Sequence, residues 1–326
     1  SPAAQLFVRY ARSRRSSVFN STQEMAAIER ICRSLDGLPL AIELAAARAC
    51  ITGVSTLLAD VTAGNVDLEN SLRDAPARHK SLNSVLEVTW HMLSASSRTV
   101  LLYAGLFPGD FTLGQLIGAS VQDSRNTERA LAELLDTRIV AADGQDPVGP
   151  SAAPEIRFRM LETIRAFVKR RQLDGEAQQI VLERRYIEYW RAFCQKVSDS
   201  RHTVDERAVL DEFERQFDNI SSAIRLAAAT DVQLAREMAA AVWFAGVRRS
   251  HIFDVIGWIE DLRLLQDVSG ETAAEVNLLS AACEVYRAAA DYVTARRFGL
   301  LAATNASQPG ADGVAAHVAV AFALVI

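Results

Sequence analysis

Apolar residues recur at every third or fourth position along most of this 326-residue chain, and this spacing predicts amphipathic α-helices. The segment from Ser21 to Leu35 is an example, with Met25, Ile28 and Ile31 on one face. Ser21 is followed three residues later by Glu24, which is the pattern of a helix start capped by both side chains. The sequence therefore predicts a mainly α fold.

One helix ends and another begins within three residues in the string LDGLPLAIELAAARA, Leu35 to Ala49. Gly37 fits the left-handed position that follows a helix, and Pro39 fits the first turn of the next one. The second helix is rich in alanine, so another backbone or a ligand can come close to it. The local pattern by itself favours a plain helix corner over a binding site.

Residues 78–173 combine several short helices with a predicted pair of strands. We expect helices at about 80–93, 96–106 and 112–119, a fourth in NTERALAELLDTR with Asn126 or Thr127 as its cap, and a closing helix at 162–172. Between the last two, RIVAA and EIRFRML predict a strand pair around a Gly/Pro loop. Helices followed by a small two-stranded wing predict a winged-helix domain.

The remaining regions, 1–77 and 174–326, are predicted to be helical. In the second region, amphipathic stretches run over 176–198, 205–230 and 232–247. A helix pair follows in NLLSAACEVYRAAADYVTARRFGLLAATNAS. Its small and aromatic positions, Ala289, Ala290, Ala295 and Phe298, resemble the tetratricopeptide (TPR) pattern.

Composition excludes several classes of protein. A formal net charge of -5 gives no overall field that would attract nucleic acid or an anionic membrane. No run of eighteen apolar residues lacks a charge, and no signal peptide precedes the first helix, so we expect no membrane span. The cysteines are Cys32, Cys50, Cys194 and Cys283, far apart in the chain, which favours free thiols in a reducing, cytoplasmic location. Ser1 and the apolar ending AVAFALVI indicate a piece of a longer protein.

The chain carries no recognisable catalytic or metal-binding pattern. Lys80-Ser81 is the only candidate for the end of a phosphate-binding loop, and no glycine precedes it in RDAPARH. AVLDEFE, Ala208 to Glu214, imitates the end of a Mg²⁺-binding strand, but an amphipathic helix with Leu210 and Phe213 inward is favoured. The five histidines show no metal-ligand spacing. We nominate no catalytic residue and no metal ligand.

Nucleic-acid binding is the usual role of a winged helix, and the charges argue against it here. The helix in the recognition position carries Glu128, Arg129, Glu133, Asp136 and Arg138, and the wing carries Asp143, Asp146 and Glu155 beside Arg157 and Arg159. Phosphate contacts need basic residues that acids do not oppose. We therefore expect a winged helix that serves packing.

The order of several strings resembles the STAND (NB-ARC-like) ATPases, and their bacterial regulators in particular. The strings are ICRSLDGLPLAIELAAARA, RHKSLNSVLEVTWHMLS, LFPGDFTL, FRMLETIRAFV and EFERQFDNISSAIRLA. The resemblance implies a helical lid over 1–77, a winged-helix domain over 78–173 and a TPR-like repeat region over 174–326. It also implies that the P-loop domain of the same protein lies upstream of Ser1.

The resemblance further implies a cofactor site. In this family the Pro of GLPL packs near the adenine of ADP or ATP, so the cofactor-binding residues expected here are Gly37, Leu38, Pro39 and Leu40. A second motif, whose His contacts the ADP phosphate, corresponds to Met160-Leu161-Glu162, and Leu161 cannot donate to a phosphate. The resting state would then be held differently, or Glu162 and Arg165 would be structural. Without its P-loop, this chain by itself should neither bind ADP or ATP with Mg²⁺ nor hydrolyse ATP.

Two hypotheses of different classes follow. The first is the sensor part of a nucleotide-dependent switch in bacterial transcription regulation. Its repeats would bind a small-molecule inducer or a protein partner, and nucleotide would control oligomerisation. The second is a stand-alone helical interaction scaffold with no nucleotide role, which the missing P-loop and Leu161 favour. DNA binding through the winged helix is a third and weaker hypothesis.

Overall fold

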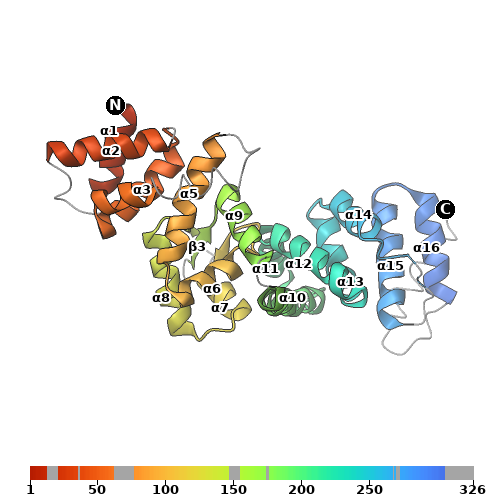
Figure 1. Cartoon of the computed structure of the whole chain (residues 1–326). Helices are drawn as coiled ribbons and strands as arrows, with labels where there is room; N and C mark the ends of the chain where they lie inside the picture. Colours follow the sequence, from red (N-terminus) through yellow and green to blue (C-terminus); the bar gives the residue numbers. More distant parts are fainter. Residues whose placement is uncertain are drawn as a thin grey trace. The chain divides into compact units, whose positions relative to one another are not determined.

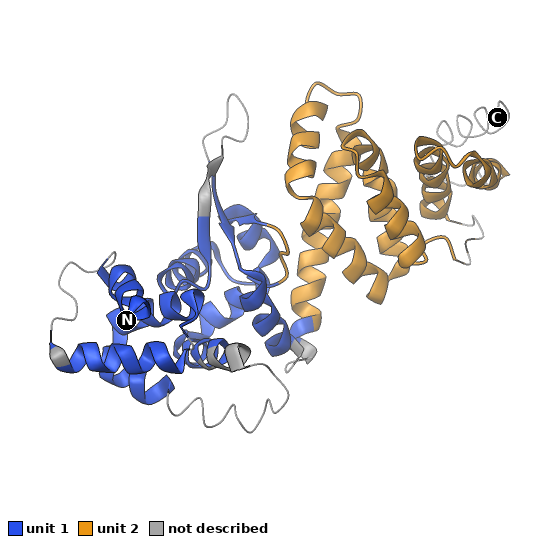
Figure 2. Cartoon of the chain, turned by 90° about the horizontal axis from the view of Figure 1, so that it is seen from above, with its two compact units in different colours: residues 1–105, 110–146, 155–179 blue, residues 106–109, 147–154, 180–326 orange. Residues whose placement is uncertain are grey.

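The computed structural model confirms the mainly α fold (Figure 1). It describes residues 1–12, 21–35, 37–61, 77–146, 155–173, 176–266, 268 and 272–304. These residues form two compact units, which are coloured separately in Figure 2. Unit 1 takes its described residues from 1–105, 110–146 and 155–179, and unit 2 from 106–109 and 180–304. Each unit is considered by itself below.

The first part of unit 1 consists of helices, the first of which packs against the next two. The helices are α1 (Pro2–Arg12), α2 (Thr22–Ser34) and α3 (Pro39–Thr52), followed by a helical stretch at 54–61. The predicted capping box is present, because the Ser21 side chain accepts from the Glu24 N–H while the Glu24 carboxylate accepts from the Ser21 N–H. Eight of the fourteen residues of α3 are buried, and the helix packs along α1. Its alanines are therefore used in helix–helix contact.

The second part of unit 1 has a winged-helix arrangement. Its helices are α5 (Ala77–Met92), α6 (Ala95–Ala104), α7 (Leu113–Ala119), α8 (Ser124–Asp136) and α9 (Glu162–Leu173). Its strands are β1 (Phe111–Thr112), β2 (Ala141–Asp146) and β3 (Glu155–Arg159). The rings of Phe111 and Phe158 lie opposite each other in the β1–β3 pairing and extend the core beneath the sheet.

Three details of the winged helix differ from the sequence prediction. The strand predicted in RIVAA begins only at Ala141 and runs to Asp146, because Arg138 has a left-handed backbone and the chain turns before Ala141. The sheet has three antiparallel strands in the order β1-β3-β2, because Phe111–Thr112 adds a short strand to the predicted pair. A two-residue strand has too little alternation to be detected in a sequence. In addition, α8 is capped by Asp123, whose side chain accepts from the Asn126 N–H, and neither Asn126 nor Thr127 is the cap.

Unit 2 is an array of helices. They are α10 (Glu176–Asp199), most of whose residues belong to this unit, α11 (Glu206–Arg215), α12 (Phe217–Thr230), α13 (Val232–Arg248), α14 (Ile252–Asp261), α15 (Ala273–Ala288) and α16 (Tyr292–Thr304). The predicted stretch 205–230 is two helices that meet at Gln216, and α14 was not predicted. AVLDEFE lies in α11 with Leu210 and Phe213 buried, so the helical interpretation is confirmed.

The predicted helix pair at the end of the described chain is present as α15 and α16. Ala289 caps α15, and Ala290 adopts a left-handed backbone with φ of 64° at the turn. Ala295 is buried on α16, and the Phe298 ring packs 5.7 Å from that of Tyr286. The helix pair is therefore present, with Ala290 exposed and Ala289 half-buried at its turn, and the TPR-like pattern stays a prediction.

Several predicted features lie outside the described residues. They are Asp36 of the helix corner, the polar loop after residue 61, the Gly/Pro loop of the wing, the side chains of His79, Lys80, Asp143 and Asp146, and everything after Thr304, including His317 and AVAFALVI.

Candidate functional site

The corner between α2 and α3 is the site that the sequence singled out. Gly37 has a left-handed backbone with φ of 67°, and its N–H donates to the Cys32 carbonyl at 3.0 Å. Pro39 is the first residue of α3. The predicted break and restart of the helix are therefore present, with Gly37 and Pro39 in the predicted conformations.

The start of α3 is exposed and has no side-chain cap. Leu38 occupies the N-cap position with an extended backbone, and its side chain accepts no hydrogen bond from the first turn. Gly37 and Pro39 are exposed, and Leu38 and Leu40 are half-buried. A helix start with free N–H groups favours negative charge or an acceptor group.

A buried arginine lies further along α3. The Arg48 side chain is only 6% exposed, and its Nη2 donates to Asp60 at 2.5 Å. Within the described residues, its Nε and Nη1 are buried without a hydrogen-bond partner. Burial lowers the pKa of Arg48, while the Asp60 carboxylate opposes this shift. Sequence reasoning missed Arg48, because an arginine inside AAARAC gives no sign of which face of the helix it occupies.

The Met160-Leu161-Glu162 triplet lies where β3 leads into α9. Met160 is buried, and Leu161 is exposed. Arg165 donates to the Met160 carbonyl at 3.0 Å and to the Glu162 carboxylate at 2.5 Å. The polar groups of this segment therefore bond to one another.

The two predicted sets of cofactor-binding residues lie in different parts of unit 1. Gly37, Leu38, Pro39 and Leu40 begin α3, whereas Met160 and Glu162 precede and begin α9. Within the described ranges, no hydrogen bond or ion pair joins one set to the other.

The helix in the recognition position, α8, exposes a balanced set of charges. Arg125 and Arg129 are exposed together with Glu128 and Asp136. Arg138 follows the helix and lies 3.8 Å from Glu43. The outward face therefore carries two bases against two acids, which gives weak attraction for phosphates.

Glu133, which the sequence suggested as another surface acid, instead closes the start of α6. Its carboxylate accepts from the Ser94 N–H at 3.0 Å, the Ser94 hydroxyl at 2.9 Å and the Ser97 hydroxyl at 2.6 Å. Burial raises the pKa of Glu133, but the hydrogen bonds from Ser97 and Ser94 outweigh it and lower the pKa overall. This contact joins residues far apart in sequence, so no local pattern indicated it.

A second contact that the sequence did not reveal joins two of the quoted strings. The Asn219 side chain in RQFDN accepts from the Gly109 N–H of LFPG at 3.0 Å. The Phe107 ring packs 5.0 Å from Tyr186 and 6.3 Å from Trp190. Asn219 and Phe107 are fully buried in unit 2, so these strings serve packing.

The cysteines agree with the sequence prediction. All four are free thiols, with Cys32, Cys194 and Cys283 buried and Cys50 half-buried. In the part of the chain that the structure describes, no group of three His, Cys, Asp or Glu side chains could hold a metal ion. Within the same ranges, every helix is too short or too polar to cross a membrane.

The chain is similar to curated mycobacterial proteins. It is 26% identical over 273 residues to proteins of Mycobacterium bovis and Mycobacterium tuberculosis that bear the name "Putative HTH-type transcriptional regulator", an alignment that covers 80% of this chain and 29% of each relative. It is 28% identical over 184 residues to an uncharacterized protein of Mycobacterium tuberculosis, covering 55% of this chain and 45% of that one. No protein-family model matches the chain.

These similarities support a relationship to a transcription-regulator-like family. The chain spans less than a third of the length of the regulators that it matches.

Proposed function

We propose that this chain is the lid, winged-helix and helical sensor part of a STAND-type switch that regulates transcription in response to bound nucleotide. The observation that carries the proposal is the exposed, uncapped start of α3 at Gly37–Leu40. A buried corner would have no surface for a nucleotide domain. An exposed proline ring beside free N–H groups can pack on a purine base.

The order of the five strings and the names of the mycobacterial relatives support a regulatory role. In this proposal the upstream part of the same protein supplies the P-loop and holds Mg²⁺. The chain described here contributes the lid over the nucleotide and has no ATPase activity of its own. The helices of unit 2 bind an inducer or protein partner, and nucleotide exchange controls assembly in the cytoplasm.

Phosphate sensing by Met160-Leu161-Glu162 is not part of the proposal. Leu161 has no donor, and the nearby Arg165 already bonds to the Met160 carbonyl and to Glu162. The segment is better explained as a local brace between β3 and α9.

The test is calorimetric titration of ADP into two proteins, this chain and one extended upstream by about two hundred residues, on the order of one domain. We expect the extended protein to bind ADP and the short chain to show no binding. Pro39→Asp in the extended protein should weaken ADP binding at least about tenfold, equivalent to about 1.4 kcal/mol. Ile51→Asp is the matched control, because Ile51 is 61% exposed at the other end of α3.

The alternative is a helical interaction scaffold without a nucleotide role, which the internally bonded Arg165 favours. If the extended protein does not bind ADP, or if Pro39→Asp and Ile51→Asp weaken binding equally, the scaffold interpretation replaces the switch. DNA binding is tested separately by an electrophoretic shift at low salt. A shift that disappears in Arg125→Glu/Arg129→Glu would restore that hypothesis.

A further inference from the structure

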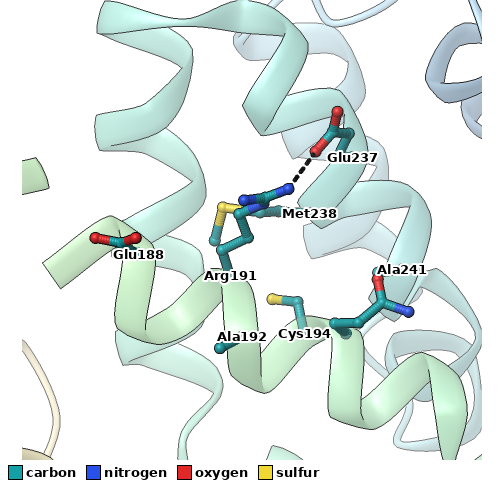
Figure 3. Close-up of a pocket in the computed structure, with 8 residues that line it drawn as sticks. Glu188, Arg191, Ala192, Cys194, Glu237, Met238 and Ala241 are labelled. Atoms are coloured by element: carbon teal, nitrogen blue, oxygen red, sulfur yellow. Dashed lines mark hydrogen bonds and ion pairs between the residues drawn. The ribbon is translucent and has the colours of Figure 1, made fainter. Parts of the chain in front are cut away.

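A groove lies between α10 and α13 in unit 2, with a cavity volume of about 340 Å³ (Figure 3). It is lined by Glu188, Arg191, Ala192, Cys194, Gln195, Glu237, Met238 and Ala241. This volume is at the lower end of the range for small-molecule sites in proteins. A ligand that fills it is therefore small.

The floor of the groove is apolar. Met238 and Cys194 are each 1% exposed, and both present sulfur. Burial raises the pKa of Cys194 to about 12, so its thiol is neutral at physiological pH. The short side chains of Ala192 and Ala241 leave space above this floor. Thioether and neutral thiol groups pack well against aliphatic chains.

The rim of the groove carries both signs of charge. Figure 3 shows Arg191 on α10 directed toward Glu237 on α13, and the two groups are 3.5 Å apart. Their side chains are 57% and 45% exposed. A long, exposed ion pair contributes little to stability. Each of the two side chains can therefore leave its partner and bind a charged group of a ligand instead. Glu188 lies one turn before Arg191 and adds a second carboxylate to the rim.

We propose that this groove binds a small zwitterion with an aliphatic tail, of the class of an apolar α-amino acid. The ligand carboxylate contacts Arg191, its ammonium group contacts Glu237, and its tail lies on Met238 and Cys194. This inference gives a ligand class to the sensor role of unit 2, and its regulatory meaning rests on the proposed function. The binding itself does not depend on the nucleotide.

The experiment is calorimetric titration of the 326-residue chain with three probes that share an aliphatic tail. L-Norleucine carries both charges, hexanoate carries only the carboxylate, and pentylamine carries only the ammonium group. We expect norleucine to bind at least about tenfold more tightly than either singly charged probe, because each charged contact is equivalent to about 1.4 kcal/mol or more. Equal binding of all three, or of norleucine and one singly charged probe, would overturn the zwitterion assignment.

Substitutions of the lining residues test whether the probe binds in the groove. Arg191→Gln should weaken norleucine binding about tenfold without weakening pentylamine binding, because it releases Glu237 from its ion pair. Glu237→Gln should weaken norleucine binding likewise without weakening hexanoate binding. Ala241→Phe should abolish norleucine binding by filling the cavity. Lys196→Gln is the control, since Lys196 is an exposed residue of α10 outside the groove. Circular dichroism establishes that each variant retains its helices.

If the native chain binds no probe, or if Ala241→Phe retains its helices and still binds norleucine, the groove is not the site. Either result leaves the nucleotide proposal untouched, because that proposal is tested at Pro39 in a different protein. Conversely, norleucine could bind in the groove while the extended protein binds no ADP. That result would support the amino-acid site and contradict its role in a nucleotide-dependent switch.

Discussion

The helix starts of α3 and α6, both in unit 1, differ in how their first-turn N–H groups are capped. At α6 the Ser94 side chain accepts from the Ser97 N–H, and the carboxylate of Glu133 arrives from α8 to accept from both serines. At α3 the N-cap residue is Leu38, whose side chain makes no cap hydrogen bond. Among the described residues, the start of α6 is therefore bonded to an internal carboxylate, whereas the start of α3 has no side-chain cap.

The difference separates stability from function. Helix starts attract negative charge in any protein, so an internal carboxylate is the simple way to satisfy one. A helix start that lacks both a capping side chain and a carboxylate is less stable by about 1 kcal/mol than a capped one. Within unit 1 the start of α3 coincides with the string that resembles a nucleotide lid.

The largest change in the free energy of unfolding is expected at the start of α6. Glu133→Ala removes the acceptor of three hydrogen bonds to a charged group and should lower the free energy of unfolding by about 1.5 to 3 kcal/mol. Urea unfolding followed by far-ultraviolet circular dichroism measures the change. Glu128→Ala, an exposed position on the same helix, should change it by less than about 0.5 kcal/mol. Equal effects of the two substitutions would mean that the start of α6 does not depend on the carboxylate.

Gly37 is the next test, at the start of α3. Gly37→Ala places a Cβ on a left-handed backbone with φ of 67°, although no atom lies within 4 Å of it. The strain should therefore cost about 1 kcal/mol, seen as a lower midpoint of thermal unfolding. Gly114→Ala is the control, since its Cβ would meet only ordinary contacts and its φ is not positive. That variant should be neutral or slightly stabilising.

The pH dependence of the start of α6 follows from Glu133. Its pKa is lower in the folded protein than in the unfolded chain, so the carboxylate contributes stability above the unfolded value. This contribution is lost as the pH falls through the lowered folded value. Glu133→Gln should therefore be less stable than the native chain at pH 7, and the difference should shrink in acid. A difference that stays constant down to pH 3 would exclude the carboxylate as its source.

The smallest change in stability is expected from Pro39→Asp in this chain. Pro39 is exposed, and a carboxylate in the first turn suits the helix dipole, so the free energy of unfolding should change by less than about 0.5 kcal/mol. Urea unfolding measures it beside Glu133→Ala. A loss above about 1 kcal/mol would show that the corner is a packing element, and any loss of ADP binding by this variant would then have a structural cause.

Local pattern sufficed for elements whose causes are local. The capping box of Ser21 and Glu24, the left-handed Gly37 and the helical start at Pro39 each depend on residues within four positions. The same holds for the helical interpretation of Ala208–Glu214, where the apolar spacing alone decided. Prediction was poorer where the signal was short, as for the strand Phe111–Thr112 and the helix boundary at Gln216.

The sequence by itself determined which segments are helices, where the glycine and proline corners fall, and that the fold is mainly α. These follow from the preferences of the backbone and from the period of the apolar residues. Only the tertiary structure decided that Glu133 bonds to the start of α6, that Arg48 is buried with two nitrogens that have no partner among the described residues, and that Arg191 pairs with Glu237 at the rim of the groove. Each of these depends on residues that are distant in sequence and adjacent in space, so the physical cause is packing, which no local pattern records.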